Sequence, residues 1–187
     1  MAIPISQVAT VASYVLKKKL AGVKRYPLVL MLEPLFRCSL ACAGCGKVQY
    51  PPHILKKQLT PEECFAAVEE CGAPMVSIPG GEPLLHPQFI RLLEIVRRED
   101  MPLTIETNGL LCTPEIAAEI AKSPNRFVSV SIDGADAETH EWVRGVPGAF
   151  EAARQAVRNL VAAGIRPQVI FTVMRRNAGL SSDGIDD

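Results

Sequence analysis

Three cysteines in one short segment are the residues of this sequence best suited to chemistry. Cys38, Cys42 and Cys45 have the spacing C-x3-C-x2-C, which lets three thiolates converge on one small object. Gly44 lies between the last two and allows the backbone to wrap closely around such an object. Thiolates are the usual ligands of [4Fe–4S] clusters, and three of them leave one iron open for catalysis. A zinc site completed by His53 is the alternative, although zinc loops more often present C-x2-C pairs.

The elements that must position this loop alternate between strand and helix patterns. Apolar runs predict strands at residues 28–34, 75–79, 103–107, 127–133 and 168–174. Helical patterns with their end signals lie at residues 7–22, 60–71, 87–98, 113–122 and 148–163. This alternation predicts an α/β fold with a parallel sheet and right-handed crossovers. Because the strand segments are apolar along their length, we expect both faces of the sheet to be covered.

Polar residues and glycines follow the predicted strands. The second strand ends in Gly80-Gly81-Glu82-Pro83, the third in Glu106-Thr107-Asn108-Gly109, and the fourth in Ser131-Ile132-Asp133-Gly134. Ligands of parallel α/β proteins bind at the carboxyl ends of the strands. The sequence therefore predicts one shared site, at the edge of the sheet where the cysteine loop also lies.

Together, the cysteine loop and the Gly-Gly-Glu-Pro turn resemble those of the radical S-adenosylmethionine (SAM) superfamily, over about residues 28–177. The resemblance implies a partial (β/α) barrel of the radical SAM type, with about five of the family's six strand–helix units and an N-terminal helix. It divides the chain into an N-terminal helical extension (residues 1–27), a core that is incomplete at its C-terminus (residues 28–177) and a disordered tail (residues 178–187).

The resemblance also implies cofactors and the residues that bind them. The three cysteines would hold a [4Fe–4S] cluster, and SAM would chelate the fourth iron through its amino and carboxylate groups. The turn after the second strand would contact the SAM amino group, since backbone carbonyls and the Glu82 carboxylate are acceptors for an ammonium. Gly44 departs from the aromatic residue that the family often has near the adenine. Four further residues are expected to hold the SAM ribose and carboxylate: Asn108, Ser131, Asp133 and Arg144.

Two branches of the superfamily are similar to different parts of the chain. Residues from about 3 to 88, including YPLVLMLEPLFRCSLACAGCGKVQYP, are most similar to hopanoid-biosynthesis enzymes, which attach the 5′-deoxyadenosyl group to a hopene lipid. This similarity predicts an adenosyl-hopene transferase. Residues from about 100 to 177, including THEWVRG (139–145) and TVMRRN (172–177), are more similar to peptide- and cofactor-maturation enzymes. That similarity predicts hydrogen abstraction instead.

Glu106 bears on the choice between these reactions. The hopanoid branch has a cysteine at this position, and its thiol is expected to give a hydrogen atom to the product radical. A carboxylate cannot do so, and the nearest thiol in the sequence, that of Cys112, lies past the strand. Because a sixth strand–helix unit is missing, an inactive cluster-binding fragment is a third alternative.

The composition of the chain limits its partners and its compartment. Its 187 residues include 20 basic and 20 acidic side chains, so bulk electrostatics gives no reason to expect nucleic acid binding. The sequence has no apolar run of membrane-spanning length and no secretory signal, which predicts a cytoplasmic protein. The resemblance implies flavodoxin or ferredoxin as the electron donor and a small-molecule substrate, which is a lipid in the hopanoid branch.

A basic segment follows the apolar N-terminal helix, from Lys17 to Arg25. With Leu16 and Leu20 it could make a peripheral contact with the inner face of an anionic membrane, where a lipid substrate would lie. The alternative is an ordinary solvated helix end. Four other histidine and cysteine residues are interpreted as loop or packing residues: His86, His140, Cys64 and Cys71.

Overall fold

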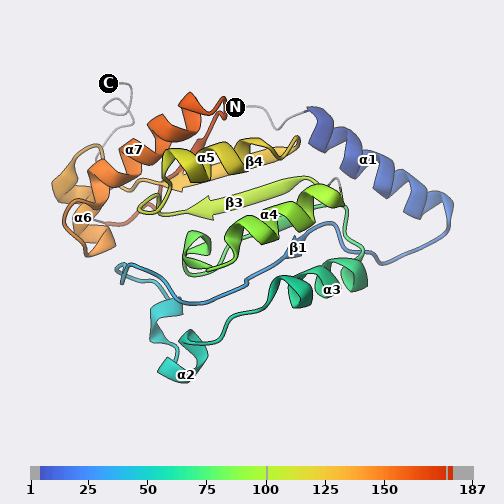
Figure 1. Ribbon diagram of the computed structural model, residues 1–187, viewed down its shortest axis with the longest axis horizontal. Coiled ribbons are helices and arrows are strands. Elements are labelled where there is room, and N and C mark those ends of the chain that lie inside the picture. The colour runs from blue at the N-terminus through green and yellow to red at the C-terminus, as the bar shows by residue number, and fades with distance from the viewer. Residues whose placement is uncertain (1–4, 100, 176, 179–187) are drawn as a thin grey trace.

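A single parallel sheet organises the computed structural model, which describes residues 5–99, 101–175 and 177–178. The strands are β1 (Leu30–Met31), β2 (Val76–Ile78), β3 (Leu103–Thr107), β4 (Arg126–Ser131) and β5 (Gln168–Ile170). Each strand pairs in parallel with the next one in the sequence, so the order across the sheet is β1-β2-β3-β4-β5 (Figure 1). The predicted α/β fold with a parallel sheet is confirmed.

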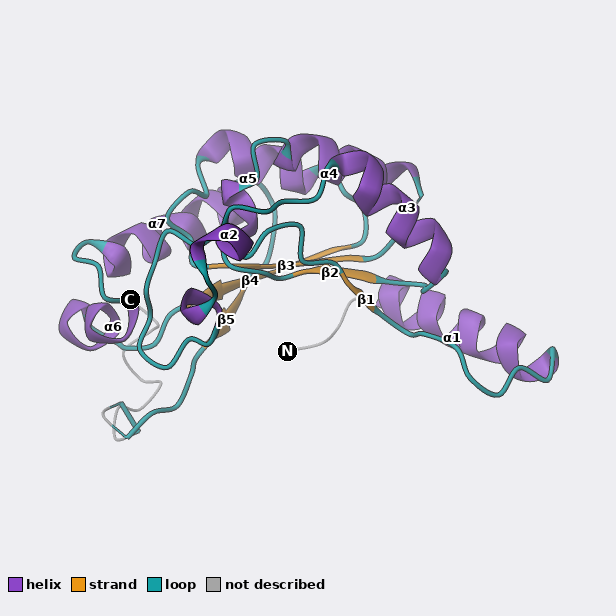
Figure 2. Ribbon diagram, turned by 90° about the horizontal axis from the view of Figure 1, so that it is seen from below, coloured by secondary structure: helices purple, strands orange, loops and turns teal. Residues whose placement is uncertain are grey.

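Helices connect the strands and cover one face of the sheet. In Figure 2, α3, α4, α5 and α7 lie side by side over that face. The α-helices are α1 (Ile5–Leu20), α2 (Pro52–Leu55), α3 (Pro61–Cys71), α4 (Phe89–Arg98), α5 (Pro114–Ala121), α6 (Ala137–Arg144) and α7 (Ala149–Ala162), and the short 3-10 helices are η1 (Lys47–Gln49) and η2 (Pro83–Leu85).

The two faces of the sheet differ in burial. Strand residues beneath the helices are fully buried, among them Ile78, Ile105 and Val128. Because side chains alternate along a strand, the intervening residues point to the other face, where Met31 is 65% exposed and Glu106 is also exposed, while Ser77 and Ser129 are buried. This face is therefore only partly covered in the described part of the chain, which differs from the expectation that both faces are covered. One covered and one open face are what a partial (β/α) barrel requires, since the open face is the barrel interior.

Local signals set the ends of α3. The Thr60 hydroxyl accepts a hydrogen bond from the Glu63 amide (3.2 Å), and the Glu63 carboxylate accepts one from the Thr60 amide (2.7 Å). Pro61 occupies the first helical position, and Gly72 ends the helix in the left-handed conformation, with φ of 58°. The start and end predicted for this helix are confirmed.

The edges of the sheet depart most from the sequence prediction. Of the apolar run 28–34, only two residues form β1, while Leu28 and Val29 are 45% and 39% exposed. An edge strand has a neighbour on one side only, so fewer of its residues are held in the ladder. The last strand is likewise shorter than predicted, three residues in place of 168–174.

Helix α6 was not predicted from the sequence. The Asp136 carboxylate caps its start by accepting a hydrogen bond from the Thr139 amide (2.8 Å), and Gly145 ends it with φ of 74°. The predicted tail, residues 178–187, lies outside the described residues apart from Ala178. Of the helices described, none has the length and apolarity needed to cross a bilayer.

Candidate cluster and cofactor site

The cysteine loop runs from the end of β1 toward α2. Cys38, Cys42 and Cys45 are all free thiols and half-buried. The loop tightens where the Cys45 amide donates to the Cys42 carbonyl (3.1 Å), and Gly44 between them has φ of 78°, a conformation that favours glycine. Among the described residues, no three His, Cys, Asp or Glu side chains gather closely enough to hold a single metal ion. A cluster of four irons and four sulfides is wider than one ion, so its thiolate ligands stand farther apart.

The glycine turn after β2 packs directly on the backbone that leads to Cys38. The Gly81 amide donates to the Leu35 carbonyl (3.2 Å), and the Glu82 amide donates to the Arg37 carbonyl (3.0 Å). A Cβ atom added to Gly81 would lie 2.2 Å from the Arg37 carbonyl oxygen, so only glycine fits there. Neither the Gly80 nor the Gly81 carbonyl accepts a hydrogen bond from another described residue. The fold thus brings the two sequence motifs into contact and leaves two acceptors open.

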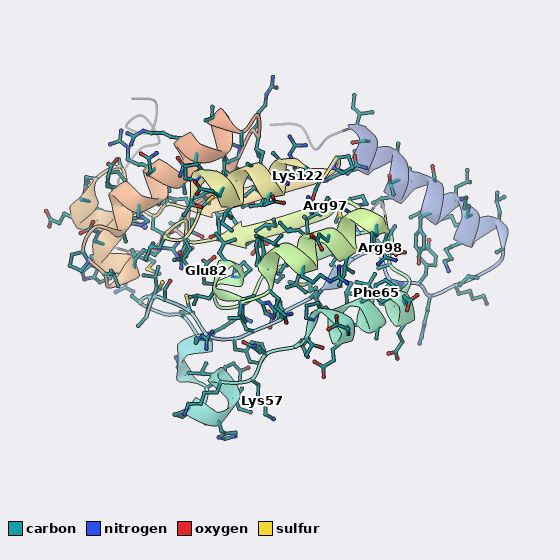
Figure 3. The ribbon with its side chains drawn as sticks, in the orientation of Figure 1. Lys57, Phe65, Glu82, Arg97, Arg98 and Lys122 are labelled. Carbon is teal, nitrogen blue, oxygen red and sulfur yellow. The ribbon has the colours of Figure 1, made fainter. Side chains whose placement is uncertain are left out.

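The Glu82 carboxylate is held by donors of the protein interior. It is fully buried and accepts hydrogen bonds from the Thr107 hydroxyl (2.7 Å), the Asn108 amide (2.8 Å) and the Leu84 amide (3.1 Å). Burial raises the pKa of Glu82, and these three donors partly oppose the rise. Figure 3 shows Glu82 beside the carboxyl end of β3. The carboxylate therefore joins the β2 turn to β3, and the open carbonyls of the turn are the acceptors that remain for an ammonium group.

Asn108 connects the end of β3 to the cysteine loop. Its side-chain nitrogen lies 3.2 Å from the Ser39 hydroxyl and 3.7 Å from the Cys38 sulfur. The Cys38 sulfur also accepts a hydrogen bond from the Leu40 amide (3.4 Å). Burial raises the pKa of the Cys38 thiol, while these N–H donors act in the opposite direction. Hydrogen bonds to a ligating sulfur are one of the means by which proteins tune iron–sulfur clusters.

A buried ion pair holds the other side of the loop. The fully buried Asp133 carboxylate lies 2.6 Å from the Arg144 guanidinium and accepts a hydrogen bond from the Thr172 amide (2.8 Å). A second guanidinium nitrogen of Arg144 lies 3.7 Å from the Cys42 sulfur. The Ala43 amide donates to the Val143 carbonyl (2.8 Å), so the last turn of α6 rests on the loop. Asp133 and Arg144 thus pair with each other, and Arg144 also reaches the cysteine loop.

Ser131 and two residues not predicted as site residues complete the rim of the site, by which we mean the carboxyl ends of the strands together with the cysteine loop. Ser131 lies half-buried at the end of β4 beside Ile170, and its hydroxyl makes no hydrogen bond with a described residue.

His140, interpreted from the sequence as a loop residue, lies buried on α6 and accepts a hydrogen bond from the Asp133 amide at Nδ1 (3.0 Å). Burial lowers the pKa of His140, which favours its neutral form. Asn177, also buried, donates to the carbonyls of Asp133 (2.9 Å) and Thr172 (3.0 Å). The spacing of four between His140 and Arg144 could have marked the two as neighbours on one helix face.

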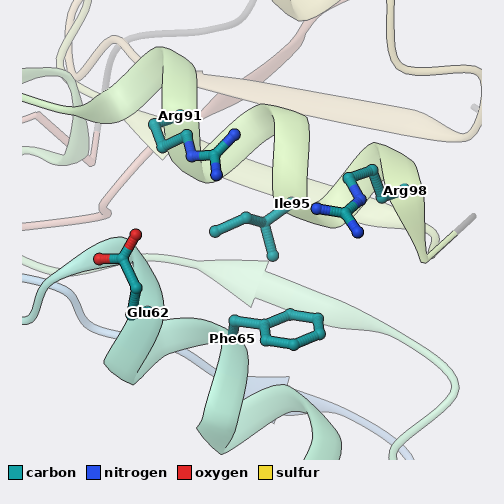
Figure 4. Close-up of a pocket in the computed structure, with 5 residues that line it drawn as sticks. All are labelled: Glu62, Phe65, Arg91, Ile95 and Arg98. Atoms are coloured by element: carbon teal, nitrogen blue, oxygen red, sulfur yellow. The ribbon is translucent and has the colours of Figure 1, made fainter.

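A hollow between α3 and α4 lies on the helix layer and does not belong to this rim. Figure 4 shows Glu62 and Phe65 of α3 facing Arg91, Ile95 and Arg98 of α4. None of these residues is a predicted site residue. The hollow lies on the covered side of the sheet, whereas the cysteine loop extends from the carboxyl ends of the strands.

Comparison with known proteins identifies the family. Residues 32–177 match the Radical SAM superfamily model. The chain belongs to the radical SAM superfamily. It is 35% identical over 162 residues to the mycofactocin maturase MftC of Mycobacterium ulcerans, covering 84% of this chain and 43% of the maturase. It is 33% identical over 154 residues to the AdoMet-dependent heme synthase of Methanosarcina barkeri, covering 81% of this chain and 44% of the synthase. The radical SAM chain therefore spans less than half the length of these curated relatives.

Solved structures share the fold. Streptococcus suis SuiB, in its complex with the precursor peptide SuiA, superposes with a TM-score of 0.71 at 19% identity, over 98% of this chain and 42% of SuiB. Methylornithine synthase (PylB) superposes with a TM-score of 0.65 at 18% identity, over 100% of this chain and 58% of PylB. The predicted radical SAM type of partial barrel is confirmed.

The residues present fit the cofactors of the radical SAM superfamily, a [4Fe–4S] cluster and SAM, as the sequence predicted. Three free thiols lie on one loop, and N–H groups of Leu40, Asn108 and Arg144 point at two of the sulfurs. The glycine turn against that loop presents two carbonyls without donors. This set combines soft ligands for iron with oxygen acceptors for an ammonium group.

Proposed function

We propose that this chain is the cluster- and SAM-binding core of a radical SAM enzyme that matures a peptide or cofactor precursor by abstracting a hydrogen atom. The observation that carries the proposal is the contact between the cysteine loop and the glycine turn, in which Gly81 fits only without a side chain. The choice of reaction is supported by relatives that are named as a mycofactocin maturase and a heme synthase. SuiB, of similar fold, has been seen with a precursor peptide.

Each group at the rim has a role in this proposal. Cys38, Cys42 and Cys45 would hold the cluster through three thiolates, leaving SAM the position that no protein thiolate fills. Once reduced by an external one-electron donor, the bound cluster would supply the electron for reductive cleavage of the SAM sulfonium to methionine and a 5′-deoxyadenosyl radical. The open carbonyls of Gly80 and Gly81 accept hydrogen bonds from the SAM ammonium. Arg144 is the cation available for the SAM carboxylate, and Ser131 offers a free hydroxyl to the ribose.

Adenosyl transfer to a hopene is the second candidate, carried by the similarity of residues from about 3 to 88 to the hopanoid branch. Two observations weigh against it. Glu106, on the open face of the sheet, stands where that branch has its hydrogen-donating thiol. Cys112, the thiol nearest in the sequence, is only 4% exposed within the core beneath the helices, and burial raises its pKa to about 11. Hydrogen abstraction needs no such thiol, so the maturation reaction is favoured.

Anaerobic reconstitution with iron and sulfide, followed by SAM and dithionite, tests the proposal. We expect bound iron and release of free 5′-deoxyadenosine, and we expect both to be lost in Cys38→Ala, Cys42→Ala and Cys45→Ala. Cys71→Ala is the matched control, because Cys71 is also a half-buried free thiol but lies on α3. Retention of the full iron content after replacement of all three loop cysteines would contradict the proposal. An adenosylated lipid formed from added hopene, in place of free 5′-deoxyadenosine, would select the second candidate.

A further inference from the structure

Helix α1 presents an apolar stripe to solvent. Its inner side is fixed to the domain by Gln7, which is 4% exposed and donates from its side chain to the Asn125 carbonyl (3.1 Å). On the opposite side Ile5, Leu16 and Leu20 are 86%, 57% and 80% exposed. Positions 5, 16 and 20 fall on one face of a helix with 3.6 residues per turn. Large apolar side chains gathered in this way on one helix indicate an interaction surface.

The apolar stripe continues into an ordered turn at the end of α1. The Gly22 amide donates to the Lys19 carbonyl (3.0 Å) and the Val23 amide to the Lys18 carbonyl (3.0 Å), while Gly22 has φ of 70°. The returning chain is held by Tyr26, whose ring packs edge-on against that of Tyr14 at 5.7 Å. Figure 2 shows α1 and this turn extending past the sheet and its helix layer. We call residues 16–28 the α1 tip; besides Leu16 and Leu20 it exposes Val23 (40%) and Leu28 (45%).

The charge of the α1 tip has one sign. No acidic residue precedes Glu33 in the sequence. Five basic residues lie among or beside the exposed apolar positions: Lys17, Lys18, Lys19, Lys24 and Arg25. The whole chain has a net charge of zero, so this concentration of positive charge is local. A projecting apolar surface ringed by Lys and Arg is the pattern of helices that lie in the headgroup region of anionic bilayers.

We propose that the α1 tip binds the surface of an anionic lipid bilayer, with Leu16, Leu20, Val23 and Leu28 among the headgroups and the basic residues against lipid phosphates. A second copy of this chain is a poor occupant, because it would bring like charges together. A globular protein partner would need a larger contact area than one helix end and one turn provide. Asn125, which Gln7 of α1 contacts, lies directly before β4, so α1 is located at the amino ends of the strands (Figure 1). Bound in this way, the protein directs the carboxyl ends of its strands away from the bilayer.

Co-sedimentation of the reconstituted chain with vesicles tests this proposal independently of catalysis. We expect binding to vesicles of mixed phosphatidylcholine and phosphatidylglycerol, no binding to phosphatidylcholine alone, and release by high salt. Leu20→Asp should weaken binding on the order of tenfold or more, and the double variant Lys17→Glu/Lys24→Glu should abolish it. Both should release 5′-deoxyadenosine from SAM at the wild-type rate if the proposed function is correct, since neither touches the rim.

Val161→Asp is the matched control, because Val161 is 57% exposed on α7 and far from the α1 tip in sequence. It should bind vesicles as the wild type does. Equal vesicle binding by wild type, Leu20→Asp and Val161→Asp would overturn the proposal. So would the absence of binding to anionic vesicles, or a Leu20-dependent dimer in gel filtration in place of vesicle binding. Circular dichroism melting curves should be unchanged in all variants, since every replaced side chain is largely exposed.

Discussion

The cysteine loop is held from two sides by supports of different physical kinds. On one side, Glu82, Thr107 and Asn108 form the β2–β3 support, in which short hydrogen bonds join two strand ends and reach Cys38. On the other side, Asp133 and Arg144 form the β4–α6 support, an ion pair that reaches Cys42. In both supports a side-chain nitrogen lies 3.7 Å from a cysteine sulfur.

The difference between the supports indicates different tasks. The β2–β3 support depends on backbone amides and short side chains that have little freedom, so it fixes the position of the loop. The β4–α6 support ends in an arginine, whose long side chain carries several N–H donors: one terminal guanidinium nitrogen pairs with Asp133 and the other lies near the Cys42 sulfur. We infer that the first support is structural and that Arg144 is the residue that adapts to a bound carboxylate.

Gly81→Ala should have the largest effect, because it removes the contact on which the β2–β3 support rests. The new Cβ would lie 2.2–2.3 Å from the carbonyl oxygens of Arg37 and Phe36, which are backbone atoms and cannot move aside alone. We expect a loss of about 4 kcal/mol or more in the free energy of unfolding, measured by urea titration, together with loss of cluster binding.

Gly46→Ala is the control for this variant. Gly46 belongs to the same region, but a Cβ added there would meet no atom within 4 Å, and its φ of −69° suits any residue. It should reconstitute normally. A Gly81→Ala protein as stable as Gly46→Ala would mean that the turn does not pack on the loop.

Asp133→Asn should have the second largest effect and tests the β4–α6 support. The amide would keep an acceptor for Thr172 but leave the guanidinium of Arg144, whose side chain is only 12% exposed, without its counter-charge. Removing one charge of a buried pair costs about 3–5 kcal/mol in the free energy of unfolding.

Glu151→Gln is the matched control, since Glu151 pairs with Arg158 at the same 2.6 Å but both side chains are at least half exposed. That change should be too small to resolve by urea titration. Equal losses in the two variants would show that the Asp133 pair is not buried in solution.

Sequence reasoning succeeded where signals are local and failed where partners are set by the tertiary fold. The capping residues of α3 and the strand alternation lie within a few positions of what they determine, so α3 and the parallel sheet were predictable. The inward turn of Glu82 depends on Thr107, 25 positions away, and no local pattern links them. The pairing of Asp133 with Arg144 requires α6, which was missed because most of its residues are polar and show little of the apolar periodicity of a helix. One-sided burial was missed because apolar runs resemble each other whether one face or both are covered.

Glu82→Gln should have the smallest effect of the three and tests the β2–β3 support through its pH dependence. The amide offers one oxygen to three donors, so at least one buried N–H or O–H loses its acceptor, at a cost of about 1–3 kcal/mol.

Because burial raises the pKa of Glu82 in the folded state, folding favours the protonated acid. That stabilisation is fully present below the usual glutamate pKa of about 4.3 and is lost as the pH rises through the raised value. The cost of Glu82→Gln should therefore be larger at mildly acidic than at mildly basic pH in urea titrations. Glu94→Gln, which replaces a 45%-exposed carboxylate of α4, should show no such trend. A cost that grows as the pH rises would mean that the folded state prefers the ionised carboxylate, and that hydrogen bonding outweighs burial at this end of β3.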